Sequence, residues 1–299
     1  MCARKVRPEE ADIDTSSVRR LVGTQFPQWA GLPLTEVVPA GTSNAMYRLG
    51  EDMAVRLPRL AGSAQDVEKE HRWLPLLAGA LPVAVPTPLG KGSPGEGYPW
   101  PWSVYSWLDG ANPTPGRHPE PALLAKDLAE FVTALRRVDA TGGPASYRSE
   151  PLAQRDEVTR SAIHELRAEL DGDGATAVWE SALRAHGWAG PAVWIHADLQ
   201  PGNVLVADGR LSAVIDFGCL GLGDPAVDLI AAWYLLPAGA REVFRTGSGA
   251  DDDAWARGRG WALSVALLEL RHYRESNPVM ASIARHVIAE LLTDGSAAV

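Results

Sequence analysis

Three polar side chains in the second half of the chain could together bind a divalent cation and a hydroxyl group. Asp198 and Asn203 lie in the segment His-Ala-Asp-Leu-Gln-Pro-Gly-Asn, and Asp216 begins the segment Asp-Phe-Gly. Mg²⁺ takes carboxylate and amide oxygens together with the phosphates of a substrate. A further carboxylate beside such an ion can orient a hydroxyl nucleophile. Each residue alone also fits a cap, a turn or a strand end, but the three at this spacing favour the catalytic interpretation.

Short apolar runs must position these side chains. They lie at residues 193–195, 204–206 and 211–215 and predict three strands. A Pro-Gly turn before Asn203 is expected to bring its amide back beside Asp198. An Asp-Gly pair between the last two runs predicts a hairpin, which returns the chain to its start. We therefore expect Asp216 to emerge close to Asn203.

Two neighbouring residues have structural interpretations. His196 has apolar neighbours and the chain contains only two cysteines, so we interpret it as a buried hydrogen-bonding residue and not as a metal ligand or base. Asp224 precedes a proline and an apolar run, which predicts a helix N-cap with proline at the first helical position. Both residues are expected to support the site without taking part in the chemistry.

The rest of the chain divides into a mixed first part and a helical second part. Up to residue 108, apolar patterns predict helices at 16–26 and 64–73, the second ended or kinked by Pro75, and strands at 35–38, 45–49, 53–57 and 100–108. After the turn-rich residues 109–115, helices are predicted at 120–138, 152–170, 176–186, 225–236, 252–274 and 279–292. We therefore predict an α+β fold with a small lobe over residues 1–106, a hinge or linker at 107–115, and a helical lobe over 116–299 that carries the catalytic loop.

The composition is that of a folded protein, with 46% hydrophobic and 22% charged residues in a chain of 299. The net charge of −9 repels phosphate, which argues against a nucleic-acid partner and favours cationic ligands. The apolar stretches are too short for a membrane span, the first ten residues do not resemble a signal peptide, and two cysteines are too few for a disulfide framework. We therefore expect a cytoplasmic protein that is a monomer or a weak homodimer.

The motif His-x-Asp-x-x-x-x-Asn followed by Asp-Phe-Gly resembles the catalytic and metal-binding loops of the protein-kinase-like fold. The Pro-Gly-Asn ending and the segment Gly-Asp-Pro-Ala-Val-Asp at 223–228 resemble the aminoglycoside phosphotransferase family in particular. Protein kinases have a long activation segment and an Ala-Pro-Glu motif, which this chain lacks, so a protein substrate is not expected. The likeness covers residues 35 to about 235. It implies a bilobal fold, with a small antiparallel-sheet N-lobe containing one main helix and a larger, mainly helical C-lobe.

This resemblance implies transfer of the γ-phosphate of ATP or GTP, with Mg²⁺, to a hydroxyl of a small molecule. Asp198 would be the catalytic base or orienter, and Asn203 and Asp216 would hold Mg²⁺. Asp228 would bond back to the backbone of the catalytic loop. Gln200 stands where protein kinases have lysine, so the loop lacks one phosphate-neutralising charge.

By the same resemblance, strand 53–57 would supply Arg56 as the cation that holds the nucleotide phosphates, where the usual residue is lysine. A guanidinium binds phosphate oxygens bidentately and stays charged when buried. A solvated strand arginine is the alternative. The partner of Arg56 would be an acidic residue on the next helix, and Glu70 is preferred over Glu68 because it lies on the apolar stripe of that helix.

Further nucleotide contacts are implied at two places in the first lobe. A turn containing Gly41, Thr42, Ser43 and Asn44 takes the position of the loop that covers the phosphates. The segment around residues 103–108 takes the position of the hinge: the Ser106 carbonyl and the Leu108 N–H would bind adenine, and Tyr105 would lie behind the base.

The family implies as acceptor an aminoglycoside-type or related antibiotic, hydroxylated and in many cases cationic. Glu269 is the candidate for binding it together with Asp198, whereas the aspartates at 251–253 fit a solvated helix start. Two alternatives stay open. One is a kinase of a choline-, homoserine- or sugar-like metabolite, and the other is a non-catalytic nucleotide-binding module, suggested by Arg56 and Gln200. A metal hydrolase built on His196, Asp198 and Asp216 is disfavoured, because no second histidine is near this loop in the sequence.

Overall fold

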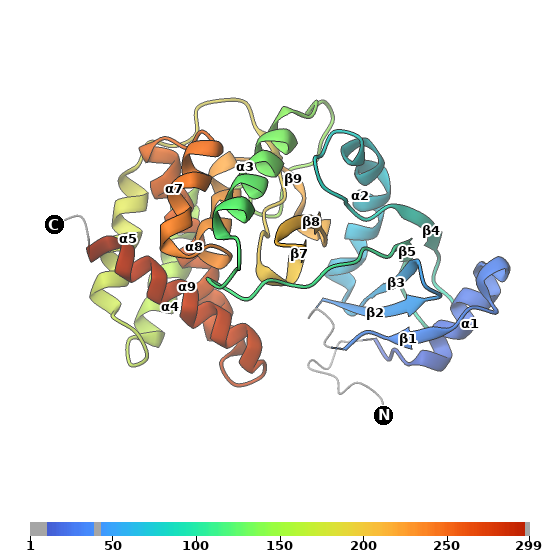
Figure 1. Ribbon diagram of the computed structural model, residues 1–299. Coiled ribbons are helices and arrows are strands. Elements are labelled where there is room, and N and C mark those ends of the chain that lie inside the picture. The colour runs from blue at the N-terminus through green and yellow to red at the C-terminus, as the bar shows by residue number, and fades with distance from the viewer. Residues whose placement is uncertain (1–10, 39–42, 297–299) are drawn as a thin grey trace. The chain divides into compact units, whose positions relative to one another are not determined.

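The computed structural model describes residues 11–38 and 43–296, and Figure 1 shows the course of the chain. The chain divides into two compact units. The first contains the chain up to Ala80, Ala84–Asp109 and Ala213–Gly218, and the second contains Leu81–Val83, Gly110–Ser212 and the chain from Cys219 on. The Asp-Phe-Gly segment therefore belongs to the first unit, and the loop that carries Asp198 belongs to the second.

An antiparallel sheet of five strands forms the first unit, in the order β1-β2-β3-β5-β4 (Figure 1). The strands are β1 (Leu34–Glu36), β2 (Asn44–Leu49), β3 (Met53–Pro58), β4 (Pro88–Gly92) and β5 (Trp102–Ser106). β3 is the central strand, and alternation along it places Arg56 on the face opposite Val55 and Leu57. Val55 and Leu57 are fully buried, so the sheet's apolar core fixes the direction of the arginine.

Two α-helices in the described part of this unit accompany the sheet. α1 (Thr15–Gln25) packs its apolar side into the same core as β2, β3 and β5. α2 (Ala61–Ala78) buries Glu70 on its inward stripe. Pro75 was expected to end or kink this helix, and the helix continues past it to Ala78. Proline removes one backbone hydrogen bond, but Leu74 and Leu77 on either side are buried, and tertiary packing outweighs the local preference.

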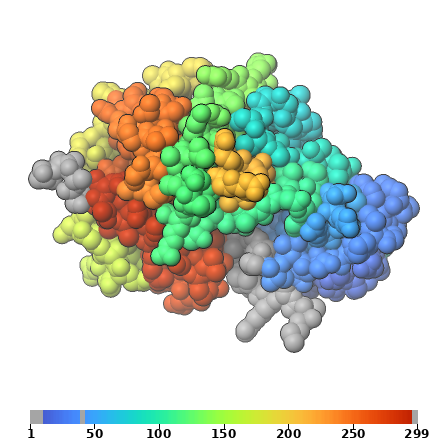
Figure 2. Space-filling model, in the orientation of Figure 1, coloured from blue at the N-terminus to red at the C-terminus, as the bar shows by residue number. Residues whose placement is uncertain are grey.

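The second unit is mainly helical. Its helices are α3 (Pro121–Arg137), α4 (Asp156–Leu166), α5 (Gly172–Arg184), α6 (Ala231–Tyr234), α7 (Ala238–Gly247), α8 (Asp252–Tyr273) and α9 (Pro278–Ser296). α8 packs against α4, α5 and α9, and α3 packs against α7, where their side chains meet at the surface in Figure 2. None of the helices in the described ranges is long and apolar enough to cross a bilayer.

Two predicted helices of this unit are broken, and one observed helix was not predicted. The helix expected at 152–170 is a 3₁₀ turn, Leu152–Arg155, followed by α4, and the helix expected at 225–236 is a 3₁₀ turn, Pro225–Ile230, followed by the short α6. Helix α7 contains glycine at 239 and 247 and follows a proline, and glycine has a low helix propensity. It forms because Phe244 and its neighbours on one face are buried.

Four short strands flank the residues that the motifs singled out. β6 (Val193–Ile195) pairs with β9 (Gly221–Gly223), which was not predicted, and β7 (Val204–Ala207) pairs with β8 (Arg210–Val214). Asp208 and Gly209 join β7 to β8 with φ angles of 50° and 74°. Positive φ at both central residues is what a two-residue hairpin turn requires, so the predicted hairpin is present.

Candidate active site

The backbone of the loop that carries Asp198 is fixed by a buried carboxylate. Asp228, in the 3₁₀ turn Pro225–Ile230, accepts hydrogen bonds from the backbone N–H of His196 at 2.9 Å and of Ala197 at 2.7 Å. Both Asp228 and His196 are fully buried, and His196 Nδ1 accepts from the N–H of Asp198 at 3.2 Å. Ala197 has a φ of 64°, a strained conformation for alanine that the surrounding contacts must hold. The loop is thus preset before Asp198 meets any ligand.

We expect Asp228→Asn to lower the free energy of unfolding by about 1–3 kcal/mol. The amide has one acceptor oxygen, so one of the two backbone N–H groups would face an NH₂ group and lose its partner. Burial raises the pKa of Asp228, against the opposing effect of His196 and the two N–H donors. Urea unfolding measures the loss. A variant as stable as the wild type would show that the two hydrogen bonds do not hold the loop.

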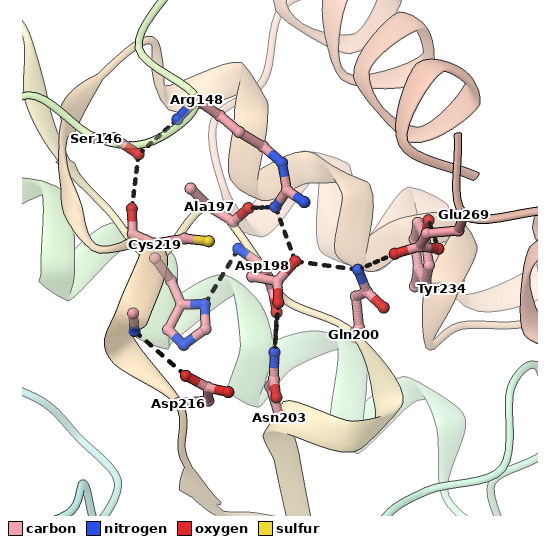
Figure 3. A network of polar contacts seen from close by, with 12 residues as sticks. Ser146, Arg148, Ala197, Asp198, Gln200, Asn203, Asp216, Cys219, Tyr234 and Glu269 are labelled. Carbon is pink, nitrogen blue, oxygen red and sulfur yellow. Dashed lines mark hydrogen bonds and ion pairs between the residues drawn. The ribbon is translucent and has the colours of Figure 1, made fainter. Parts of the chain in front are cut away.

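The carboxylate of Asp198 has different partners on its two oxygens, as Figure 3 shows. Oδ1 accepts from Arg148 Nη1 at 2.8 Å and from Gln200 Nε2 at 3.0 Å. Oδ2 accepts from Asn203 Nδ2 at 2.8 Å. The side chain of Asp198 is 23% exposed and that of Arg148 is 12% exposed, so the carboxylate can still be reached while the guanidinium is nearly covered.

Asn203 lies at the end of the 3₁₀ turn Pro201–Asn203, which begins β7. Its Nδ2 donates to both the carbonyl and the carboxylate of Asp198, at 2.8 Å each, and this orientation leaves Oδ1 as the atom able to accept or to coordinate. Asn112 fixes the turn, because its Nδ2 lies 3.0 to 3.2 Å from the carbonyls of Pro201, Gly202 and Val204. The Pro-Gly turn therefore does bring Asn203 beside Asp198, as predicted.

Glu269 of α8 is hydrogen-bonded to Gln200 in the Asp198 loop. Its Oε1 accepts from Gln200 Nε2 at 2.6 Å, and its Oε2 accepts from the hydroxyl of Tyr234 at 2.8 Å. Burial raises the pKa of Glu269 to about 7, and the nearby charge of Asp198 acts in the same direction, while the bonds from Tyr234 and Gln200 oppose it. Glu269 is therefore a carboxylate that changes charge near neutral pH.

This ionisation gives a testable pH dependence of stability. The pKa of Glu269 is about 7 in the folded chain against an ordinary 4.5, so the folded state holds the proton more tightly. The stabilising contribution is complete below the lower value and is lost as the pH rises towards the higher one. We expect Glu269→Gln to remove about 1–3 kcal/mol of this change between about pH 5 and about pH 8, measured by urea unfolding. A wild-type minus variant difference that does not change with pH would contradict this.

The first unit brings together another set of the predicted residues. Arg56 Nη1 donates to the two oxygens of Glu70 at 2.6 and 2.8 Å, and Nη2 donates to Oδ1 of Asp216 at 2.7 Å. With its amide oxygen turned towards the guanidinium, Asn44 accepts from Nε at 3.0 Å and from Nη2 at 2.9 Å. Burial alone would lower the pKa of Arg56, but the carboxylates of Asp216 and Glu70 hold it well above its usual value. All three guanidinium nitrogens thus have partners.

Glu70, and not Glu68, is the partner of this arginine. Glu70 is 2% exposed and also accepts from the hydroxyl of Tyr105 at 2.5 Å, whereas Glu68 pairs with Lys91 at the surface. The buried stripe of α2 therefore selects the residue that the helical pattern favoured. The hydroxyl of Tyr105, which was expected behind a bound base, is engaged with Glu70.

The backbone at Asp216 is strained. Its φ is 59°, and Oδ1 also accepts from the N–H of Gly218 at 3.3 Å. Phe217 is fully buried, and Lys69 of α2 donates to the carbonyl of Gly218, so the two residues that follow the aspartate are both anchored. The side chain of Asp216 is nevertheless 40% exposed. A strained, anchored and still accessible carboxylate is typical of a functional position.

The remaining predicted residues have simpler surroundings. Gly41 and Thr42 lie outside the described residues; Ser43 is exposed, Ser106 ends β5, and Leu108 follows it, half-buried. Asp224 caps the 3₁₀ turn that it precedes, accepting from the N–H of Ala226 at 2.9 Å. At the start of α8, Asp251 is the N-cap, Asp252 pairs with Arg245, and Asp253 pairs with His186.

The described residues contain no group of three or more His, Cys, Asp or Glu side chains that could hold a metal ion.

Comparison with known proteins identifies the family. A family model described as the phosphotransferase enzyme family matches residues 35–261. The chain belongs to this family. The resemblance seen in the sequence and the prediction of a phosphotransferase that acts on hydroxyl groups are therefore confirmed. No curated protein matches the chain.

Solved structures of this family share the fold. A GDP complex of aminoglycoside 2'-phosphotransferase-IIIa is 20% identical, with a TM-score of 0.74, covering 95% of this chain and 100% of that one. Macrolide 2'-phosphotransferase MphH from Brachybacterium faecium is 24% identical, with a TM-score of 0.60 and coverages of 93% and 97%. A gentamicin complex of APH(2'')-IIa is 15% identical, with a TM-score of 0.63 and coverages of 94% and 97%. The predicted α+β, protein-kinase-like fold is confirmed.

Sequence reasoning missed Arg148 and Asn112, which both contact the Asp198 loop. Arg148 comes from the irregular segment after α3, and Asn112 from the turn-rich residues that were expected to be a linker. Neither residue is part of a motif or of a periodic pattern. Only the three-dimensional contacts reveal them.

Proposed function

We propose that this phosphotransferase moves the γ-phosphate of ATP or GTP to a hydroxyl of an aminoglycoside or a related antibiotic. The observation that supports this most strongly is the Asp198 carboxylate, preset by Asp228, bound on Oδ1 by Arg148 and Gln200, and still accessible. Solved relatives include complexes with kanamycin, gentamicin or streptomycin, and others are macrolide phosphotransferases. The composition of the chain is consistent with a cytoplasmic location, where ATP and GTP are available.

In this proposal Asp198 accepts a hydrogen bond from the acceptor hydroxyl and aims its oxygen at the γ-phosphorus. The new O–P bond forms as the bond between the γ-phosphorus and the β-bridging oxygen breaks, ADP or GDP leaves, and the hydroxyl proton passes to Asp198 and then to solvent. The paired guanidinium of Arg148 steadies the carboxylate. Asp198 therefore acts mainly by orientation.

Asn203 and Asp216 are proposed to hold Mg²⁺. The donors fit such an ion: Asn203 has Oδ1 turned away from Asp198, and Asp216 offers a partly exposed carboxylate. When bound, Mg²⁺ would neutralise charge on the β- and γ-phosphates. The nucleotide contacts expected of Gly41, Thr42, Ser43, Asn44, Tyr105, Ser106 and Leu108 remain part of this proposal.

The role of Arg56 is more specific than phosphate binding alone. Because its nitrogens already contact Glu70, Asp216 and Asn44, we propose that it positions the metal-binding carboxylate and reaches phosphate only by exchanging one of these partners. We expect Arg56→Lys to lower kcat/KM for the nucleotide about 10-fold, because one ammonium group cannot replace two diverging nitrogens. Initial rates at varied nucleotide concentration test this. An unchanged kcat/KM would mean that one point charge is sufficient.

The function is tested with purified protein, labelled ATP or GTP, Mg²⁺ and a panel of acceptors. The panel contains aminoglycosides, macrolides, peptide antibiotics, choline, amino alcohols and sugars. We expect transfer to at least one antibiotic, shown by a labelled product. Transfer only to choline, amino alcohols or sugars would make the protein a metabolite kinase, and nucleotide binding without transfer to any acceptor would make it a non-catalytic module.

A further inference from the structure

Two charged residues contact the Asp198 loop from elements outside the motif. Arg148 comes from the segment between α3 and the 3₁₀ turn Leu152–Arg155, and Glu269 comes from α8. In Figure 3 they approach Asp198 from different directions, Arg148 directly and Glu269 through Gln200. The proposed reaction needs neither residue for bond making or breaking, so their contacts require a separate explanation.

Arg148 is itself held in place. Ser146 Oγ donates to the carbonyl of Cys219 at 2.8 Å and accepts from the backbone N–H of Arg148 at 3.2 Å. The guanidinium then donates to the carbonyl of Ala197 as well as to Asp198 Oδ1. One nitrogen of a nearly buried, anchored side chain thus fixes a single oxygen of the carboxylate.

Gln200 is the second donor to Oδ1 of Asp198. Its Nε2 has two hydrogens, and these lie towards Asp198 Oδ1 at 3.0 Å and Glu269 Oε1 at 2.6 Å. If the amide were reversed, its oxygen would face two acceptors, which is unfavourable. Glu269 in turn is fixed by the hydroxyl of Tyr234. The orientation of Gln200 is therefore determined by Glu269 as much as by Asp198.

The two oxygens of Asp198 then differ in capacity. Oδ1 accepts from two donors, and Oδ2 accepts from Asn203 alone within the described part of the chain. A carboxylate oxygen has two lone-pair sites, so Oδ2 retains one. A hydroxyl group that approaches Asp198 can use this site without displacing a protein donor.

We propose that Glu269 is a positioning residue: it orients the Gln200 amide, which with Arg148 holds Oδ1 of Asp198 and leaves Oδ2 to accept the hydrogen bond of the acceptor hydroxyl. This inference rests on the proposed function, because it requires that Asp198 meets a hydroxyl. It also gives the carboxylate of Glu269 a role in the loop, through Gln200 and Tyr234, that differs from the acceptor contact expected from the sequence.

The kinetic test compares two substitutions of Glu269 in the full chain. Glu269→Met removes the acceptor for Gln200, and we expect kcat to fall about 10- to 100-fold with the KM of the nucleotide unchanged. Glu269→Gln can offer its oxygen to Gln200 and its NH₂ to Tyr234, so it should keep kcat within about 3-fold of the wild type. Glu130→Gln, at an exposed position on α3, is the matched control and should match the wild type.

A double-mutant cycle shows whether Glu269 acts through Gln200. Gln200→Leu should lower kcat about as much as Glu269→Met, and the double variant should lose no more than either single variant, because the two residues act as a unit. Losses that multiply would overturn the proposal. So would a Glu269→Met variant in which only the KM of the acceptor rises, since Glu269 would then contact the acceptor directly.

A second readout does not depend on transfer. The side-chain NH₂ signals of Gln200, identified by their loss in Gln200→Leu, should shift with pH around a midpoint near 7 as Glu269 ionises, and should stop doing so in Glu269→Gln. Among the residues that the structure describes, the charged or titratable groups facing Glu269 are Tyr234, Asp198 and Arg148. Gln200 signals that do not respond overturn the link itself. A wild type with titrating signals but no transfer overturns the proposed function, and with it any role of this link in transfer.

Discussion

We expect Asp198→Asn to lower kcat about 10³-fold, because it changes the one group proposed to contact the acceptor hydroxyl. The amide keeps one oxygen for Arg148 and Gln200, but its NH₂ group would lie where Oδ2 now accepts from Asn203. The atom that we assign to the acceptor hydroxyl would then be a donor, unable to take the hydroxyl proton. Single-turnover transfer of labelled phosphate measures the loss.

Two controls separate this effect from misfolding. The substitution leaves the Arg148 guanidinium without a carboxylate partner, which costs stability when a charge is nearly buried, so unfolding is measured in parallel. Asp173→Asn, an exposed change in the first turn of α5, should leave the rate unchanged and lower the free energy of unfolding by less than about 1 kcal/mol. Nucleotide affinity should persist in Asp198→Asn. A folded variant with a near-normal rate would remove Asp198 from the mechanism.

The sequence predicted an element correctly where the local spacing of apolar residues matches the burial of those residues in the folded chain. The strand around Arg56 was found because Val55 and Leu57 alternate with it, and burial follows the same alternation. Glu70 was preferred because the helical stripe that contains it is the one that packs inward. In both places the local preference and the tertiary structure require the same arrangement.

The prediction failed where tertiary packing overrides a local preference. The helix predicted at 64–73, with Pro75 expected to end or kink it, continues past Pro75 to Ala78, because the residues on either side of the proline are buried. The apolar run after Asp224 was expected to be one α-helix, and its first part is a fully buried 3₁₀ turn. Helix α7 contains two glycines and follows a proline, and it forms against α3. These outcomes depend on contacts between distant segments, which a pattern within one segment does not contain.

The site residues also differ in how well the local sequence predicts them. Asp198 and Asn203 were found because they lie five positions apart with a Pro-Gly turn between them, so the local chain alone brings them together. Arg148 is 50 residues from Asp198 in sequence, and Glu269 is 69 residues from Gln200. No local rule pairs residues at such separations. The partners of a catalytic side chain were therefore less predictable than the side chain itself.

Arg148 supplies Asp198 with a positively charged partner that the loop itself does not contain. Gln200 replaces the lysine that protein kinases carry two residues after the aspartate, which suggested a deficit of positive charge. The structure places a guanidinium on the same carboxylate from another segment, 2.8 Å from Oδ1. The glutamine does not leave Asp198 without a cation.

The second large effect is expected for Asp216→Asn, which should lower kcat about 10²- to 10³-fold and raise the Mg²⁺ concentration needed for half-maximal rate. Asparagine tolerates the left-handed backbone that the φ of 59° requires, so the segment should keep its conformation. What changes is the charge: the neutral amide is a weaker ligand for a hard cation and a weaker partner for Arg56 Nη2.

Measuring rate against Mg²⁺ concentration separates these two consequences. If Asp216 binds the ion, excess Mg²⁺ recovers part of the lost rate, whereas a loss caused only by a displaced Arg56 does not respond to Mg²⁺. Glu68→Gln is the matched control, because this exposed carboxylate lies on the same helix as Glu70 and forms its ion pair with Lys91, away from Arg56. An Asp216→Asn variant with the wild-type Mg²⁺ dependence would exclude Asp216 as a metal ligand, since replacing a charged ligand by a neutral one must weaken the binding of a divalent cation.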